Sequence, residues 1–165
     1  QGCTLACKGC WNTQYWPSQG GEEILVSQLL SELDLLDDIE GITILGGEPL
    51  QQAPATLALI EGCKQRDLTV FLYTGYELEE FDVTMQACFD ASDIVITGRY
   101  EQDKRDTTLR WRGSLNQQVH LISSRYNQLV LGGRTEVECH ILSNGNLTVV
   151  GYAESEFIDN LEVFS

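Results

Sequence analysis

Short apolar runs alternate along the first 100 residues with longer segments in which apolar residues recur at helical spacing. The short runs are rich in β-branched residues and predict buried strands at 41–45, 68–73 and 93–97. The longer segments predict helices at 22–39, 54–66 and 78–90. A repeated order of strand, loop and helix is typical of βαβ units, so the expected fold class is α/β with a parallel sheet.

The first expected helix has a simple pattern. Its apolar face consists of leucines that recur every three to four residues, at Leu25, Leu29, Leu33 and Leu36. Glu22 and Glu23 would lie in its first turn, where the helix dipole favours negative charge. The remaining acidic residues of this segment are interpreted as a solvated face.

The last third of the chain predicts β-structure, with strands at 119–122, 127–131, 137–141 and 147–150. Asn144 and Gly145 predict a hairpin turn between the last two strands, because this pair tolerates positive φ angles. His120 and His140 lie in these runs and are interpreted as structural. We therefore expect one domain over residues 1–165, in which residues from about 118 onward form a β-rich extension.

Two of the predicted strands end in small or polar motifs. Gly46, Gly47, Glu48 and Pro49 follow the first strand, and Thr74, Gly75 and Tyr76 follow the second. Ligand sites in α/β proteins lie at the carboxyl ends of parallel strands. Glycines let a backbone approach a ligand closely, so both loops are candidates for a binding site.

Three cysteines near the start of the chain, Cys3, Cys7 and Cys10, are the strongest chemical signal. A closed zinc site needs four ligands, and the other three cysteines and both histidines lie far along the sequence. An iron-sulfur cluster is ordinarily held by four thiolates, so three would leave one iron open to another molecule. The alternatives are a redox pair formed by Cys7 and Cys10, or a zinc site completed by a distant residue.

Together, these motifs resemble those of the radical S-adenosylmethionine (SAM) superfamily. The three-cysteine loop is followed by Trp11 and Asn12, by the Gly-Gly-Glu-Pro run, by Thr74, Gly75 and Tyr76, and by a late motif at 112–117. This order is most similar to the activating enzymes of glycyl radical proteins, above all to the activase of anaerobic ribonucleotide reductase. The resemblance covers roughly residues 1–120.

The resemblance implies a partial, open (β/α) barrel with a β-rich tail, and a radical SAM oxidoreductase activity. Cys3, Cys7 and Cys10 would bind a [4Fe-4S] cluster, and SAM would chelate the open iron. Cofactor-binding residues would be Trp11, Asn12, Gly46, Gly47, Glu48, Pro49 and Thr74. No side chain would act as an acid or base, because the radical chemistry belongs to the cofactors.

The implied reaction begins when flavodoxin or ferredoxin reduces the cluster. SAM is then cleaved, a 5'-deoxyadenosyl radical forms, and a glycyl radical enzyme such as anaerobic ribonucleotide reductase is activated. Three departures weaken this substrate assignment: Lys8 replaces the usual proline, Thr97 replaces an acidic residue, and the tail from about Gln118 onward adds β-structure that the shortest activases lack. The alternatives are a radical SAM enzyme that acts on a small molecule or peptide, and a degenerate binding module.

Charge and composition narrow the partners and the compartment. The 165 residues include 10 basic and 25 acidic side chains, for a net charge of -15, which disfavours nucleic acid and anionic membranes. Scattered cysteines and the absence of an apolar span or signal predict a cytoplasmic protein.

Two segments of the chain carry further expectations. The loop at 98–113 concentrates Lys104, Arg105, Arg110 and Arg112, so it is either a contact for an acidic partner or simply a charged loop. The family feeds a strand into its cysteine loop, and this sequence opens on Gln1, so we expect its N-terminal strand to be missing.

Overall fold

The computed structural model describes residues 1–126, 128 and 137–150. Its main sheet has four strands in the order β1 (Gly41–Ile44), β2 (Thr69–Tyr73), β3 (Ile94–Thr97) and β4 (Gln118–Leu121). The first three strands are parallel, and β4 pairs antiparallel with β3. The prediction of an α/β fold with a parallel sheet is therefore confirmed.

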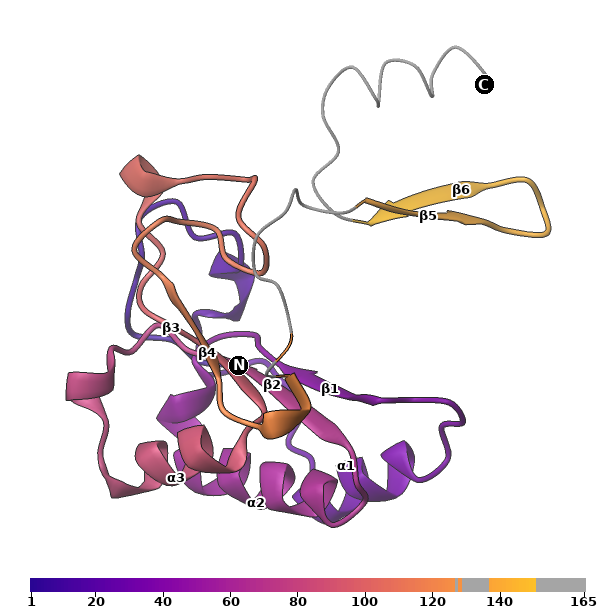
Figure 1. Cartoon of the computed structure of the whole chain (residues 1–165), viewed down its shortest axis with the longest axis horizontal. Coiled ribbons are helices and arrows are strands. Elements are labelled where there is room, and N and C mark those ends of the chain that lie inside the picture. Colours follow the sequence, from indigo (N-terminus) through magenta and orange to yellow (C-terminus); the bar gives the residue numbers. More distant parts are fainter. Residues whose placement is uncertain (127, 129–136, 151–165) are drawn as a thin grey trace.

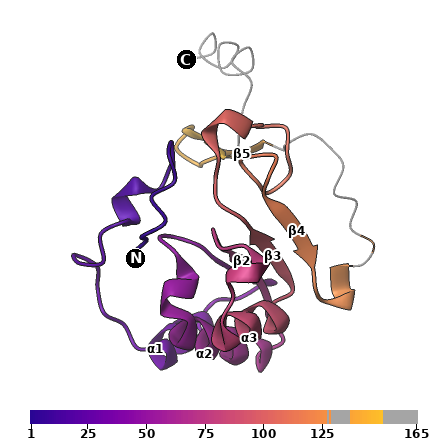
Figure 2. The same ribbon diagram turned by 90° about the vertical axis from the view of Figure 1, so that its left-hand side faces the viewer.

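Three helices cover one face of the sheet: α1 (Val26–Leu33), α2 (Ala53–Lys64) and α3 (Val83–Ala91). They lie side by side at the bottom of both views, and the chain after β3 runs away from them (Figures 1 and 2). Alternate residues of the strands point into this layer, and the resulting core includes Val70, Leu72, Val95, Ile60 and Cys88, all at most 1% exposed. Burial on this face explains the β-branched runs seen in the sequence.

The opposite face of the sheet carries a second set of apolar side chains. Register places Phe71 beside Ile94 and Tyr73 beside Ile96 on this face. The rings of Phe71 and Tyr73 stack with centroids 4.8 Å apart, and Trp111 packs edge-on against Phe71 at 5.2 Å. No helix covers this face in the described part of the chain (Figure 2), and Phe71 and Tyr73 are half-buried there.

The first helix is shorter than its sequence pattern predicts, and the prediction of 22–39 was wrong at both ends. Leu25 is extended at the N-cap and 72% exposed, so Glu22 and Glu23 lie outside the first turn. The helix packs through Leu33, as predicted, and through Leu30, which the pattern did not include. Gly62 of α2 leaves room for the Leu30 side chain, since a Cβ at position 62 would lie 2.3 Å from a Leu30 methyl.

The segment expected as one helix at 78–90 is also divided. A short 3-10 turn (Leu78–Glu80) precedes α3, and Asp82 caps the helix by accepting hydrogen bonds from the backbone N–H groups of Thr84 and Met85, both at 2.8 Å. This side-chain cap fixes the new helix start, so the chain bends at Phe81.

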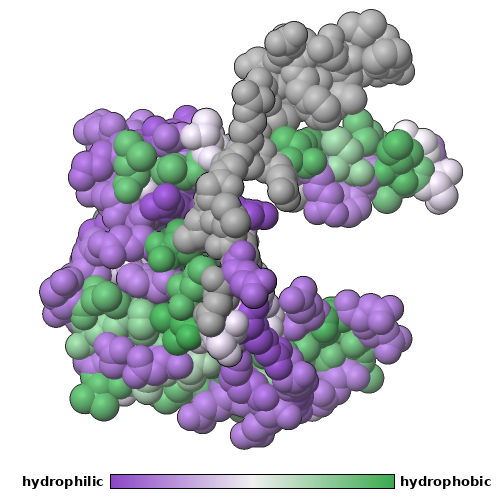
Figure 3. Space-filling view, in the orientation of Figure 1, coloured by the Kyte–Doolittle hydropathy of each residue, from purple (hydrophilic) through white to green (hydrophobic). Residues whose placement is uncertain are grey.

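In the tail, β5 (Glu138–Ile141) and β6 (Leu147–Val150) form a separate two-stranded antiparallel sheet. The hairpin is confirmed, but its turn is longer than the predicted two residues. The strand pairing ends at Ile141 and Leu147, the N–H of Leu142 donates to the carbonyl of Asn146, and Gly145 has φ +86° whereas Asn144 has no positive φ. The predicted strand at 127–131 lies outside the described residues, apart from position 128. Hydrophilic side chains dominate the visible surface of the main body, whereas the hairpin shows both kinds (Figure 3). None of the helices in the described ranges is long and apolar enough to cross a bilayer.

Candidate cofactor site

Three loops meet at one edge of the sheet because β1, β2 and β3 are parallel. The loop from Gly46 follows β1, the loop from Thr74 follows β2, and Gly98 follows β3. Residues 1–16 lie against this same edge, as the backbone and side-chain contacts below establish. The structure thus brings all the sequence motifs to one side of the molecule.

The cysteine loop is a tight, irregular turn. Ala6 and Gly9 have left-handed φ angles of 50° and 76°, and the N–H of Cys10 donates to the carbonyl of Cys7 at 3.1 Å. Left-handed residues reverse the chain within a few positions. The three cysteines, all half-buried and free of disulfides, are therefore carried on one short turn.

Backbone hydrogen bonds dock this loop onto the motif that follows β1. The N–H of Glu48 donates to the carbonyl of Gly2 at 2.8 Å. Gly47 makes this approach possible, since a Cβ there would lie 2.3 Å from the same carbonyl oxygen. Behind the loop, Gly2 and Cys3 donate to the carbonyls of Tyr15 and Trp16.

Side chains complete the docking. Gln51 donates to the hydroxyls of Thr4 at 2.7 Å and Tyr76 at 3.2 Å, so it links the cysteine loop to the loops after β1 and β2. A Cβ at Gly75 would lie 2.5 Å from a Leu5 methyl, so Leu5 packs directly on that glycine. The cysteine loop is held by both neighbouring loops rather than by its own contacts alone.

Glu48 connects the same two loops from inside. Its carboxylate, 3% exposed, accepts hydrogen bonds from the hydroxyl of Thr74 and the N–H groups of Leu50 and Gly75, at 2.8–2.9 Å. Burial raises the pKa of Glu48, and these three hydrogen bonds oppose that rise. The side chains of Glu48 and Thr74 thus join the loop after β1 to the loop after β2.

The Cys10 sulfur has a nearby hydrogen-bond donor. The N–H of Asn12 donates to Sγ of Cys10 at 3.4 Å. Burial raises the pKa of Cys7, as do the neighbouring Cys10 and Cys3, whereas the Tyr100 N–H and the Arg99 guanidinium lower it. Such donors stabilise thiolate, the form that binds metal.

The donor set fits a polynuclear centre better than a single ion. In the described residues, no three His, Cys, Asp or Glu side chains are gathered closely enough to hold one metal ion. A tetrahedral zinc ion would bring its sulfurs to within about 3.8 Å of one another, given Zn–S bonds near 2.3 Å. Three half-buried cysteines on one turn, one of them with an N–H donor, suit a cluster held by thiolates.

Other residues expected at the site lie around this loop. The space beside Gly46 is open, with nothing within 4 Å of where a Cβ would be, so its peptide is accessible to a ligand. Pro49 is buried and begins the 3-10 turn Pro49–Gln52. Trp11 is 56% exposed, with the Arg105 guanidinium 5.2 Å from its ring centroid.

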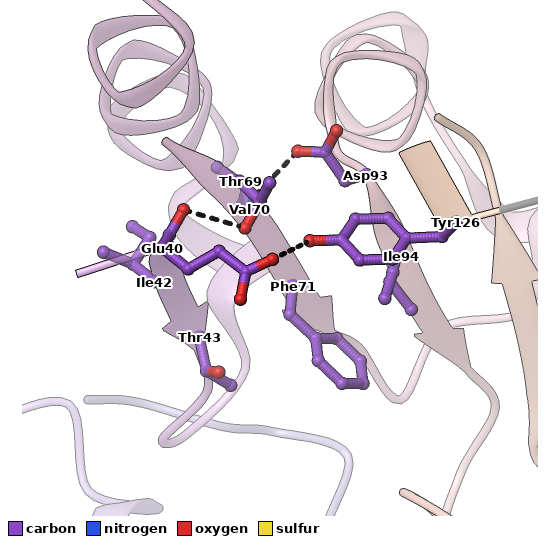
Figure 4. Close-up of a pocket in the computed structure, with 10 residues that line it drawn as sticks. Glu40, Ile42, Thr43, Thr69, Val70, Phe71, Asp93, Ile94 and Tyr126 are labelled. Carbon is purple, nitrogen blue, oxygen red and sulfur yellow. Dashed lines mark hydrogen bonds between the residues drawn. The ribbon is translucent and has the colours of Figure 1, made fainter. Parts of the chain in front are cut away.

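Two cavities lie at opposite ends of the parallel strands. One, of about 250 Å³, adjoins the cysteine loop and is lined by Leu5, Cys7, Lys8 and residues 99–103. The other, of about 230 Å³, lies at the amino ends of the parallel strands, where Tyr126 donates to Glu40 (Figure 4). Only the first is next to the cysteines, so it is the candidate for a bound co-substrate.

Comparison with known proteins gives a consistent result. A family model described as a 4Fe-4S single cluster domain matches residues 1–120. The anaerobic ribonucleoside-triphosphate reductase-activating protein of Haemophilus influenzae is 34% identical over 127 residues, which cover 72% of this chain and 82% of that protein. The protein of the same name from Pasteurella multocida is 37% identical over 133 residues, with the same coverage. The chain belongs to this family of radical SAM activases.

A more distant relative extends the same picture. The pyruvate formate-lyase 1-activating enzyme of Escherichia coli is 27% identical over 101 residues, covering 58% of this chain and 41% of that enzyme. Membership of the radical SAM activase family makes the chain an oxidoreductase with a [4Fe-4S] cluster and SAM as cofactors. The resemblance seen in the sequence motifs is confirmed.

Several residues that build the site escaped the sequence reasoning. Gln51 and Leu5 hold the cysteine loop, yet Gln51 lies outside the motifs and Leu5 occupies only a spacer position between Cys3 and Cys7. Arg99 lies between the loops: it pairs with Glu80 at 2.8 Å, donates to the Gly75 carbonyl and lies over the Tyr76 ring. Its position one residue beyond Gly98, at the end of a predicted strand, was the available signal.

Proposed function

We propose that this protein generates a radical from SAM at a [4Fe-4S] cluster held by Cys3, Cys7 and Cys10, and uses it to activate a glycyl radical enzyme. The observation that carries the proposal is the docking of the cysteine loop, through Gly2, onto Gly47 and Glu48. The names of the relatives favour anaerobic ribonucleoside-triphosphate reductase as the target.

Different residues of the chain would bind the cluster, bind SAM and position the loops between them. The three thiolates would hold the cluster. The backbone of Gly46, which has open space beside it, would form hydrogen bonds with the amino acid part of SAM. Glu48 and Thr74 would act by fixing that loop, and Pro49 by starting the turn behind it. Trp11 and Asn12 would flank the cluster, the latter through its N–H bond to Cys10.

When bound, the two cofactors supply a one-electron cleavage of SAM into methionine and a 5'-deoxyadenosyl radical. The protein's contribution is to hold both in register and to limit access of water. The electron would come from flavodoxin or ferredoxin. The partner's glycine would approach the accessible sheet face, beside Phe71 and Tyr73, with the strands curved as a partial, open (β/α) barrel.

The first test is cofactor binding and turnover. Anaerobic reconstitution should give about four irons per chain, and Ala at Cys3, Cys7 or Cys10 should abolish this, whereas Cys139→Ala should not, because Cys139 is exposed in β5. Reduced protein should then convert SAM to 5'-deoxyadenosine. Iron uptake that survives loss of a loop cysteine would overturn the ligand assignment.

The second test addresses the target. Reduced protein, SAM and anaerobic ribonucleotide reductase should together give the doublet of a glycyl radical in electron paramagnetic resonance spectra. SAM cleavage with no such signal on a competent reductase would exclude this partner and favour a smaller substrate. If the reduced protein, loaded with its cluster and SAM, forms no 5'-deoxyadenosine, the chain is a binding module and not an enzyme.

A further inference from the structure

The loop at 98–113, which follows β3, differs in charge from the rest of the chain. It holds five of the ten basic residues and three of the 25 acidic ones, whereas the remaining chain has five basic and 22 acidic residues. The loop is therefore net positive on a strongly negative protein. An acidic molecule is repelled by the protein as a whole but attracted to this loop, which favours one orientation of approach.

Backbone pairing holds the loop in a defined position. Arg105 and Ser114 form an antiparallel bridge, and the N–H of Leu115 donates to the carbonyl of Lys104 at 2.9 Å. The hydroxyl of Ser114, which is fully buried, accepts from the N–H of Glu101 at 3.2 Å. The cations of the loop are thus carried on a backbone that is fixed on both sides of Arg105.

Three of the five cations of the loop are bound to groups of the protein itself. These pairs are Arg99 with Glu80, Lys104 with Glu101, and Arg112 with the carbonyl of Gln117, all at 2.8 Å. Their main role is to hold the loop and its neighbours together. The other two cations, Arg105 and Arg110, have different surroundings.

Arg105 and Arg110 each lie on a tryptophan ring. The Arg105 guanidinium is 5.2 Å from the ring centroid of Trp11, and the Arg110 guanidinium is 5.1 Å from that of Trp111. Trp11 directly follows the cysteine loop, whereas Trp111 packs on Phe71 of the sheet face that no helix of the described chain covers. A guanidinium stacked on a ring keeps its N–H groups in its own plane, where they can bind a carboxylate through two hydrogen bonds.

The surroundings of Arg105 suit an interface with another protein. Arg105 is exposed, and no acidic side chain in the described ranges forms an ion pair with it. Its neighbour Trp11 is 56% exposed, and Arg and Trp are the residue types enriched at binding hot spots. Residues 99–103 of the same loop line the cavity beside Cys7. A macromolecule whose reacting residue enters that cavity would therefore contact this loop.

We propose that the loop at 98–113, together with Trp11, docks an acidic segment of the partner enzyme, whose Asp or Glu side chains pair with Arg105 and Arg110. The inference rests on the proposed function, because it takes the partner to be a glycyl radical enzyme. Charged contacts of this kind steer association and weaken as salt screens them. They set the affinity for the partner and leave the cleavage of SAM itself unchanged.

The test measures how much anaerobic ribonucleotide reductase is needed for half-maximal activation. The initial rate of glycyl radical formation is followed by electron paramagnetic resonance at low ionic strength. We expect Arg105→Glu and Arg110→Glu each to raise the half-saturating concentration about 10-fold, because the carboxylates of the partner would then face a negative charge. Formation of 5'-deoxyadenosine without the reductase should stay at the wild-type level.

Two further variants make the result specific. Arg125→Glu makes the same change of charge at an exposed ion pair with Asp67, so it should leave the half-saturating concentration at the wild-type value. Arg105→Gln removes the charge without reversing it, so it should weaken docking less than Arg105→Glu. Raising the salt concentration should bring all the variants closer to the wild type.

Thermal unfolding shows which variants are folded. Wild-type half-saturation in folded Arg105→Glu and Arg110→Glu proteins would overturn the inference, as would an equal loss in Arg125→Glu. Titration calorimetry separates docking from chemistry. A wild type that binds the reductase but forms no glycyl radical would overturn the proposed function, and weaker binding by Arg105→Glu would still support the docking surface; a wild type that does not bind the reductase would overturn both.

Discussion

The carbonyl oxygen of Gly2 accepts a hydrogen bond from the N–H of Glu48, and the absence of a side chain at Gly47 is what lets the two segments meet. Positions 2 and 48 are 46 residues apart in sequence, yet this contact ties the cysteine loop to the carboxyl end of β1. The placement of the three cysteines thus depends on Gly47, a residue without a side chain.

Gly47→Ala tests this dependence. The added methyl would lie 2.3 Å from the Gly2 carbonyl oxygen, so the loop must shift or the backbone must move, at a cost of about 1–3 kcal/mol. Iron content after anaerobic reconstitution should fall well below that of wild type. Gly21→Ala is the matched control, because its methyl would meet only the flexible Gln1 side chain; wild-type iron content in Gly47→Ala would show that the docking is dispensable.

His120 should make stability depend on pH. Its Nε2 lies 2.9 Å from the Thr97 hydroxyl and its ring packs against Phe89, and burial lowers its pKa below the ordinary 6.5. Because the pKa of His120 is lower in the folded protein, the unfolded chain takes up a proton at a higher pH than the folded one does. The contribution of His120 to the free energy of unfolding is therefore complete above pH 6.5 and is lost as the pH falls through the native pKa. The slope is at most about 1.4 kcal/mol per pH unit.

Chemical denaturation between pH 8 and pH 5 measures this effect. His120→Gln keeps a side chain able to bond Thr97 but cannot take the proton, so the loss of stability below pH 6.5 should be reduced. The control is His140→Gln in the exposed strand β5. A pH profile that is identical in wild type and His120→Gln would show that this histidine does not contribute.

The buried carboxylate of Asp93 makes Lys64 a stabilising residue. Asp93, 0% exposed, accepts from Lys64 at 2.7 Å and from the N–H of Val70 at 2.8 Å, which ties α2 to β2 and β3. Burial alone would raise the pKa of Asp93, but the bonds from Lys64, Val70 and Ser123 outweigh it and hold the pKa below its usual value.

Lys64→Met would leave that charge unpaired inside the protein and should lower the free energy of unfolding by about 3 kcal/mol. Urea denaturation at pH 7 measures the change. Arg66→Met removes the neighbouring ion pair with Asp34, which is exposed, and should cost clearly less. Equal losses in the two variants would contradict a special role for the buried carboxylate.

The sequence predicted the elements whose residues are constrained by burial on a single face. The three parallel strands and α2 appear within one or two residues of their expected bounds, because β-branched runs between polar loops have few other solutions. The prediction that the motifs meet at one edge of the sheet followed from the strands being parallel. The bend at Asp82 could also have been read, since Asp before a helical run is an N-cap signal.

Tertiary contacts decided the rest, and no local pattern encodes them. Leu25 fits the helical spacing, but α1 packs where Gly62 leaves room for Leu30. Glu48 belongs to a recognised motif, yet only the structure shows that its carboxylate is fully occupied by Thr74, Leu50 and Gly75. Residues 112–117 also contact the segment after β3, since the side chains of Asn116 and Gln117 donate to the carbonyls of Arg99 and Gly98.

The accessible, partly aromatic face of the sheet has a calorimetric consequence. Phe71 and Tyr73 are half-buried there, and no helix of the described chain covers them. A macromolecule that covered this face would remove apolar surface from water, which gives association a negative change in heat capacity. The enthalpy of binding would then become more favourable on warming, and titration calorimetry at several temperatures would distinguish a partner seated on this face from one held mainly by surface charges.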